Sequence, residues 1–229
     1  MTDQSEWTGK VGNVWAEEWQ RTDRSFGPLT QKLLAAARSA PFAQAIDIGC
    51  GAGEISLTLA AGAPSSHVLG VDISDDLLQV ARVRGKDRPN LRFELANAAN
   101  WHAGAAERPD LVVSRHGVMF FADPTAAFTH IAGQAAPGAR LAFSCFRERA
   151  DNIWARELAS IAPPGEEPAP DPEAPGPFAF GRRERTETLL AQSGWTDIAF
   201  EAVDYGMVAG EGAEAAADAL SYFQRIGPV

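Results

Sequence analysis

A glycine-rich turn carries the clearest chemical pattern in this sequence. Gly49, Gly51 and Gly53 fall within five residues, directly after an apolar run that ends at Ile48. Glycines at such a junction allow a tight turn and let the backbone approach a ligand closely. Turns of this kind between a strand and a helix bind several classes of cofactor, and they also occur without any ligand.

The spacing of the glycines argues against two common cofactor classes. A dinucleotide-binding turn reads G-x-G-x-x-G, but here Glu54 occupies the third glycine position and Gly53 comes one residue early. This disfavours an NAD-linked oxidoreductase. A P-loop is excluded because no Gly-Lys-Ser/Thr follows. Asp47 and Glu54 place carboxylates at both edges of the turn, so a cationic or zwitterionic ligand suits it better than a pyrophosphate does.

The pattern D-x-G-x-G-x-G resembles motif I of the class I S-adenosylmethionine-dependent methyltransferases. The cofactor of that family carries an ammonium and a sulfonium group. The resemblance is strongest over residues 40–146 and extends to a bacterial small-molecule subgroup similar to type-11 and type-25 methyltransferases. It implies that the methionine side of a cofactor site is formed by Asp47, Gly49, Cys50, Gly51 and Gly53.

Three later segments extend the resemblance in the order typical of the family. Asp72 follows the second expected strand, where the family uses a carboxylate to accept hydrogen bonds from both ribose hydroxyls, and Ile73 would lie against the adenine. Asn97 and Ala98 stand where the family commonly has Asp-Ala, and an amide oxygen can still accept from the adenine amino group. Ser114 ends the fourth expected strand, at the switch point where open sheets bind ligands.

Asp72 has a second interpretation, as a plain cap of the helix that follows. Ser74 competes for that role, because it directly precedes an acidic first turn. Ribose binding is therefore the favoured interpretation of Asp72.

The acceptor side offers one candidate catalytic residue. Methyl transfer from a sulfonium is an in-line displacement, and alignment of the reactants can supply at most about 7–11 kcal/mol of the barrier. A general base is needed only where the acceptor must lose a proton. His116, just past the fourth expected strand, is the best candidate for that base, with plain ring packing as the alternative. Arg115 could pair with an anionic acceptor, but a surface carboxylate is the favoured partner.

Alternating strands and helices must position these residues. Apolar runs predict six strands, at residues 44–49, 67–72, 91–96, 110–115, 139–146 and 196–208. Helices are expected at residues 28–39, 54–62, 74–85, 123–135, 182–194 and 210–227. This alternation is typical of an α/β fold with a doubly wound, Rossmann-like, mostly parallel sheet that carries helices on both faces.

We expect a single methyltransferase domain over residues 1–229. The expected parts are a helical cap or lid at 1–40, a cofactor-binding core at 41–146, a Pro-rich insertion at 147–181 and a C-terminal helix–strand–helix unit at 182–229. Trp15 and Trp19 lie four residues apart, on one face of an expected helix near the start of the chain. The Pro-rich segment is either a linker or a lid, and our hypothesis is that it closes over the acceptor together with residues 1–27.

The sheet of class I methyltransferases has seven strands in the order 3-2-1-4-5-7-6, and only six are expected here. We therefore expect a truncated or incomplete copy, or a variant with an unusual sheet edge. A cofactor-binding protein without turnover is the competing interpretation.

Composition narrows the range of partners and compartments. The chain has 229 residues and a formal net charge of −10, which disfavours nucleic acid and membrane surfaces as partners. The family resemblance implies a small-molecule acceptor. Cys50 and Cys145 are isolated, no spacing suggests a metal site, and no signal peptide or apolar run of about 18 residues occurs, so we expect a cytoplasmic protein. The oligomeric state stays open, as does the methylated atom: oxygen, nitrogen or carbon.

Overall fold

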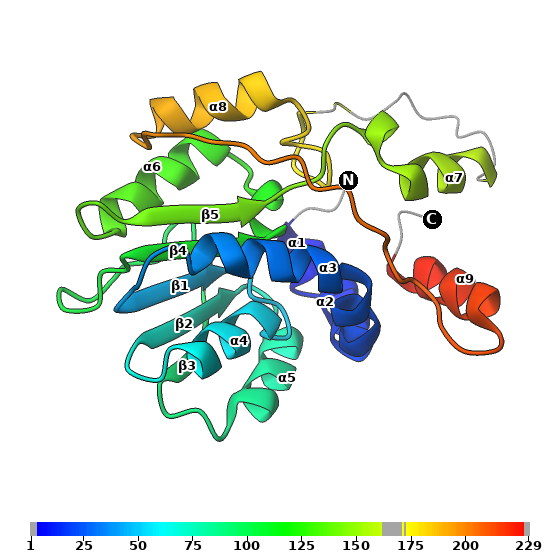
Figure 1. The fold of residues 1–229 in the computed structure, drawn as a ribbon, viewed down its shortest axis with the longest axis horizontal. Coiled ribbons are helices and arrows are strands. Elements are labelled where there is room, and N and C mark those ends of the chain that lie inside the picture. The colour runs from blue at the N-terminus through cyan, green and yellow to red at the C-terminus, as the bar shows by residue number, and fades with distance from the viewer. Residues whose placement is uncertain (1–3, 162–170, 172, 227–229) are drawn as a thin grey trace.

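The protein is built around a parallel five-stranded sheet (Figure 1). The computed structural model describes residues 4–161, 171 and 173–226. The strand order is β3-β2-β1-β4-β5, so the chain leaves β1 in one direction and returns to its other side at β4. The strands are β1 (Gln44–Ile48), β2 (His67–Asp72), β3 (Leu91–Leu95), β4 (Leu111–Arg115) and β5 (Arg140–Ser144). The first five expected strands and the Rossmann-like fold are thereby confirmed.

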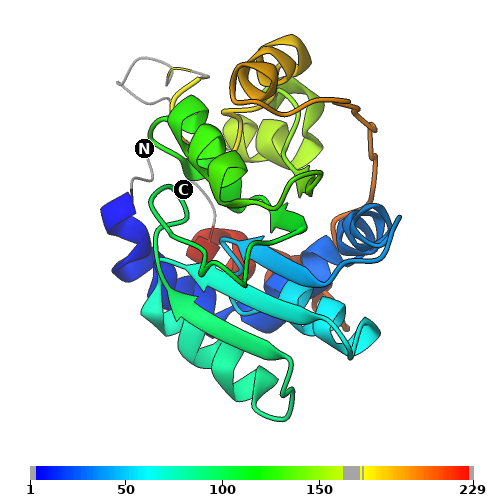
Figure 2. The same cartoon turned by 90° about the vertical axis from the view of Figure 1, so that its left-hand side faces the viewer.

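Helices cover both faces of the sheet, as Figure 2 shows. One face packs against α3 (Trp19–Ala37) and α4 (Glu54–Gly62), with α5 (Asp75–Gly85) beside α4 over β2 and β3. The other face packs against α6 (Pro124–Gln134) and α8 (Arg183–Gln192). Alternation within β4 explains the two cores, because Val112 faces α6 whereas Leu111 and Val113 face α3 and α4.

Further helices gather near the carboxyl ends of the strands. Before α3 lie α1 (Gln4–Trp7) and α2 (Lys10–Glu17), and α9 (Ala215–Ile226) packs beside α2 and α3 (Figure 1). The short 3₁₀ turns η1 (Gly117–Phe120) and η2 (Arg149–Asp151) and the helix α7 (Ile153–Ile161) follow β4 and β5. These elements stand where a ligand site of an open α/β sheet is expected.

Two expectations for the N-terminal helices were wrong. The helix expected to start near Pro28 begins at Trp19, with Pro28 in its interior. Proline removes one backbone hydrogen bond there, and tertiary contacts of the first half of α3 offset that loss. Trp15 and Trp19 do not share a helix, because α2 ends at Glu17 and α3 starts at Trp19.

The sixth expected strand, at residues 196–208, is absent from the described structure. Exposure does alternate there, with Val203, Tyr205 and Met207 half-buried between exposed neighbours. However, the segment makes no backbone hydrogen bond to β5 among the described residues. The apolar alternation identified the inward-facing side chains, but a strand also needs a partner strand. The described sheet therefore ends at β5.

The described residues contain neither a membrane-spanning helix nor a cluster of metal-binding side chains. None of their helices combines the length and apolar character needed to cross a membrane. Within the same part of the chain, no group of three or more His, Cys, Asp or Glu residues is arranged to hold a metal ion.

Candidate active site

A cavity of about 1430 Å³ opens at the carboxyl edge of the sheet. Its walls include the glycine turn after β1, the ends of β2 and β4, helices α2, α3 and α9, and residues 173–179. Binding sites for single small molecules usually measure about 300–1,000 Å³. This cavity therefore has room for two ligands side by side.

The glycine turn has a backbone that requires glycine. Gly49, Gly51 and Gly53 all have positive φ, at 62°, 54° and 86°. A Cβ on Gly49 would also lie 2.7 Å from the Cα of Gly117, so the turn packs directly against the segment after β4. Gly49 and Gly51 line the cavity together with Cys50, whereas Gly53 lies behind it, against Phe93. The turn thus presents bare backbone to the cavity.

Asp72 connects the glycine turn to the start of α5. Its carboxylate accepts the Gly51 N–H at Oδ2 (2.8 Å) and the Ser74 N–H at Oδ1 (2.9 Å). Burial raises the pKa of Asp72, and these amides oppose that shift. Ser74 caps α5 by accepting the Leu77 N–H. Because each carboxylate oxygen holds two acceptor sites, Asp72 keeps capacity for a ligand in the cavity that it lines with Ile73.

Asp47 is a buried carboxyl with one free oxygen. Its Oδ2 accepts hydrogen bonds from the Ser56 hydroxyl (2.6 Å) and the Ser56 N–H (3.1 Å). Its Oδ1 has no partner among the described residues. Burial raises the pKa of Asp47 to about 7. A carboxyl oxygen left unpaired beside a glycine turn suits a cationic ligand group, because such a group would favour the ionised form.

The remaining predicted cofactor residues divide between the cavity wall and its support. Asn97 and Ala98 line the cavity, and the Asn97 side-chain oxygen also accepts the Ala99 N–H (2.9 Å). Ser114 is fully buried and does not line it. The Ser114 hydroxyl donates to the Ile48 carbonyl (2.7 Å) and accepts the Val118 N–H (3.3 Å). Its contacts hold the end of β1 against the segment after β4.

His116 lines the cavity from the β4 side. It is a non-glycine residue with positive φ, at 68°, and its ring stacks on Phe146 with centroids 4.3 Å apart. The buried Nε2 atom has no partner in the described structure. Burial, and secondarily the charge of Arg115, lower the pKa of His116 to about 3. The imidazole is therefore neutral at pH 7, and it is better suited to hydrogen bonding than to holding a proton.

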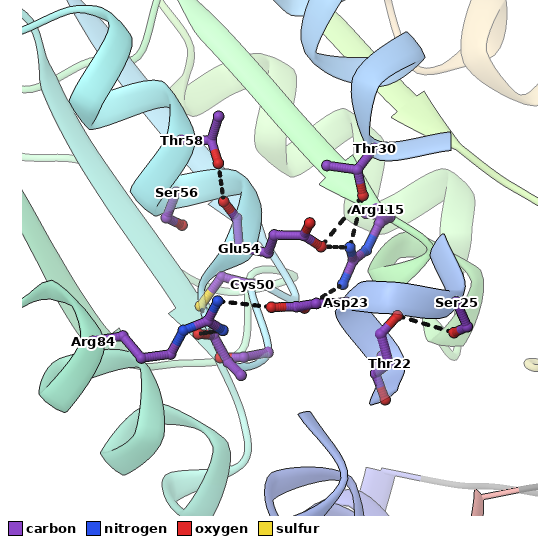
Figure 3. A network of polar contacts seen from close by, with 12 residues as sticks. Thr22, Asp23, Ser25, Thr30, Cys50, Glu54, Ser56, Thr58, Arg84 and Arg115 are labelled. Carbon is purple, nitrogen blue, oxygen red and sulfur yellow. Dashed lines mark hydrogen bonds and ion pairs between the residues drawn. The ribbon is translucent and has the colours of Figure 1, made fainter. Parts of the chain in front are cut away.

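Arg115 pairs with carboxylates of a half-buried network rather than with a surface carboxylate, which corrects the sequence expectation. It pairs with Glu54 and Asp23 and donates to the Thr30 hydroxyl (2.8 Å), as Figure 3 shows. Asp23 is shared with Arg84 at 2.7 Å. Glu54 therefore forms an ion pair with Arg115, although its place at the edge of the turn had indicated that it would bind the ligand.

Sequence reasoning placed residues 1–27 and the Pro-rich segment at this cavity, but it missed Phe146, Trp154 and the wall that α9 forms. Phe146, Trp154 and Phe178 line the cavity from segments that follow the sheet. Tyr222 of α9 lines it as well, and its hydroxyl bonds to Thr22 and Ser25 of α3, each at 3.1 Å. No local motif marks these residues, because chain segments far apart in sequence bring them together.

Comparison with known proteins agrees with this geometry. Residues 45–138 match the family model described as a methyltransferase domain. Residues 45–138 therefore form a methyltransferase domain, similar to those of the class I S-adenosylmethionine-dependent methyltransferases. A trans-aconitate 2-methyltransferase from Variovorax paradoxus (strain S110) is 31% identical to this chain over 164 residues, which are 72% of the chain and 58% of the relative.

Two further proteins extend the comparison. A trans-aconitate 2-methyltransferase from Methylobacterium radiotolerans is 35% identical over 120 residues, covering 52% of this chain and 44% of the relative. This chain thus spans about half the length of the curated relatives that it matches. The crystal structure of magnesium protoporphyrin IX methyltransferase from Synechocystis PCC 6803, with bound S-adenosylhomocysteine, has a TM-score of 0.62 at 15% identity, covering 84% of this chain and 89% of that one. At that identity the likeness shows the fold.

Proposed function

We propose that this protein transfers a methyl group from S-adenosylmethionine to a small-molecule acceptor by in-line displacement. The main support is the free carboxyl oxygen of Asp47 beside the glycine turn, at the switch point of the sheet. The cavity volume of about 1430 Å³ adds room for donor and acceptor together. Bound S-adenosylmethionine would supply the electrophilic methyl group.

The residues of the cavity wall fit the donor in distinct ways. We assign the ammonium group to Asp47, the ribose hydroxyls to Asp72 and the methionine backbone to the amides of Gly49, Cys50 and Gly51. We assign the adenine ring to the space between Ile73 and Ala98. The adenine amino group then faces Asn97. Gly53 and Ser114 support the turn from behind.

His116 belongs to the acceptor side in this proposal. A neutral imidazole with a free Nε2 atom can fix the acceptor by one hydrogen bond. The described parts of residues 1–40 and 147–181 serve as cap and lid around the acceptor, in a single domain with the core at 41–146.

Calorimetry with S-adenosylmethionine, S-adenosylhomocysteine and NAD tests the donor. We expect the first two to bind with dissociation constants in the micromolar range and NAD not to bind. Binding of NAD alone would contradict the proposal. A methyl-transfer assay over a panel of acceptors then tests turnover, because a protein that binds the donor without turnover would methylate none of them.

A further inference from the structure

Aromatic side chains form a pocket at the acceptor end of the cavity. We define this aromatic pocket by five residues that line the cavity: Phe26, His116, Phe146, Trp154 and Phe178. Phe146 touches all the others, with ring centroids 4.3 Å from His116, 5.4 Å from Trp154, 6.2 Å from Phe178 and 6.3 Å from Phe26. Flat apolar walls of this kind favour a flat apolar ligand.

Two polar atoms in the aromatic pocket lack partners. The buried Nε1 of Trp154 and the buried Nε2 of His116 make no hydrogen bond within the described structure. An indole N–H can only donate, whereas a neutral imidazole nitrogen donates or accepts according to its tautomer. Buried polar groups are normally paired, so these two atoms indicate an oxygen-bearing group on the ligand.

The cations around the aromatic pocket are largely engaged. Arg115 is held by Glu54 and Asp23. On the other side, Arg182 and Arg185 both pair with Glu173. A ligand with several carboxylates would find few cations to neutralise it here and would place its charge against aromatic faces, whose π-electrons repel anions.

Arg149, which is exposed, differs from these three arginines. Its guanidinium lies 5.5 Å from the centroid of the Phe178 ring and has no carboxylate partner among the described contacts. A single cation at the mouth of the pocket can neutralise one anionic group, which is fewer than a tricarboxylate carries.

We propose that the acceptor is an aromatic hydroxyl compound bound in the aromatic pocket, with its oxygen hydrogen-bonded by Trp154 and His116. This inference rests on the proposed function and departs from the trans-aconitate named for the relatives. During transfer, the acceptor oxygen forms a bond to the methyl carbon while the carbon–sulfur bond breaks and leaves its electron pair on sulfur. The hydroxyl proton is released to solvent, and His116 Nε2 accepts the hydrogen bond of that hydroxyl without keeping the proton.

The test compares 2-naphthol with trans-aconitate as ligands of the full chain saturated with S-adenosylhomocysteine. Because no methyl group is present, calorimetry measures binding without turnover. We expect 2-naphthol to bind at least tenfold more tightly than trans-aconitate. Equal or tighter binding of trans-aconitate would overturn the inference, and so would the absence of 2-naphthol binding.

Two matched variants test the role of the indole N–H. Trp154→Phe keeps an aromatic ring but removes the donor, and we expect it to weaken 2-naphthol binding at least fivefold. Trp195→Phe is the control, because the Trp195 N–H donates to the Phe128 carbonyl and lies outside the cavity lining. Equal 2-naphthol affinities of the two variants would show that the Trp154 N–H does not hold the ligand, against the inference.

The failure of this inference can be told apart from that of the proposed function. Binding of S-adenosylhomocysteine is measured first, in the absence of any acceptor. If it binds but 2-naphthol does not, only the acceptor class is wrong. If S-adenosylhomocysteine itself does not bind, the proposed function fails and the acceptor inference fails with it.

Discussion

Asp72 connects the glycine turn to the following helix, so a single carboxylate organises two parts of the cavity wall. Replacing Asp72 by Ala leaves the buried N–H groups of Gly51 and Ser74 without an acceptor, at about 1–3 kcal/mol for each unsatisfied group. We expect the Asp72→Ala variant to bind S-adenosylhomocysteine at least tenfold more weakly by calorimetry. Asp75→Asn is the control, because Asp75 is exposed and contacts only Gln79 and Arg82 among its described partners.

Asp47 makes stability depend on pH in an unusual direction. Its pKa of about 7 in the folded protein lies above the usual 3.8, so between these values the folded protein keeps a proton that the unfolded chain has lost. The contribution of Asp47 to the free energy of unfolding therefore falls as pH rises from about 4 to 7. The lowered pKa of His116 acts in the opposite direction over an overlapping range, and it masks this trend in the unmodified protein.

Comparison with Asp47→Asn removes the effect of His116, because both proteins contain it. Between pH 5.5 and pH 8 we expect the variant to gain about 2 kcal/mol in free energy of unfolding relative to the unmodified protein. Urea unfolding at the two pH values measures this difference. The same relative stability at both pH values would mean that Asp47 titrates as an ordinary carboxyl.

The position of a single residue in the cavity wall could be predicted where the residues next to it in the sequence form a motif. Asp47 and Asp72 were identifiable because each has a fixed place beside glycines or at a strand end. Arg115 was misassigned because its partners Glu54 and Asp23 lie 61 and 92 positions away. Ion pairs between distant segments leave no spacing pattern in a single sequence.

At the scale of elements, the Arg115 network joins α3, α4 and the end of β4. Arg115→Met leaves Glu54 and Asp23 with one cation fewer in a site where all three side chains are less than 20% exposed. We expect a loss of about 3–5 kcal/mol in free energy of unfolding. The control is Arg82→Gln, which breaks the exposed pair with Asp75 and should cost less than about 1 kcal/mol.

A double variant separates the charge effect from a packing effect. Adding Glu54→Gln to Arg115→Met removes one of the two carboxylates left without their partner. We expect the double variant to be more stable than Arg115→Met alone in the same denaturant experiment. If it is equally unstable, the loss comes from packing of the arginine side chain, and the ion-pair explanation fails.

Element type could be predicted wherever the local pattern and the tertiary environment agree. The five parallel strands were found because their apolar runs are short and bounded by turns. Residues 196–208 have the alternation of a strand, but among the described residues they have no strand to pair with. Helix α3 was predicted to start nine residues too late, since its contacts outweigh the signal of Pro28.

At the scale of the whole molecule, α9 completes the cavity by docking on α2 and α3. Tyr222 is fully buried and its hydroxyl bonds to Thr22 and Ser25. Tyr222→Phe should therefore lower the free energy of unfolding by about 1–2 kcal/mol, as measured by denaturant titration. Tyr205→Phe is a matched control, because the buried Tyr205 hydroxyl has no described partner and its removal should be neutral or stabilising. Similar losses in both variants would contradict this account.

The docking of α9 also sets the order in which the site can be made during protein synthesis. The sheet is complete once Ser144 has left the ribosome, whereas α9 starts only at Ala215. At about 5–20 residues per second, translation of the intervening segment takes several seconds. Throughout that time the nascent chain exposes the sides of α2 and α3 that α9 later covers. A chaperone that shields this surface would act during that interval. The wall of the cavity is complete only when α9 has been synthesised and has docked.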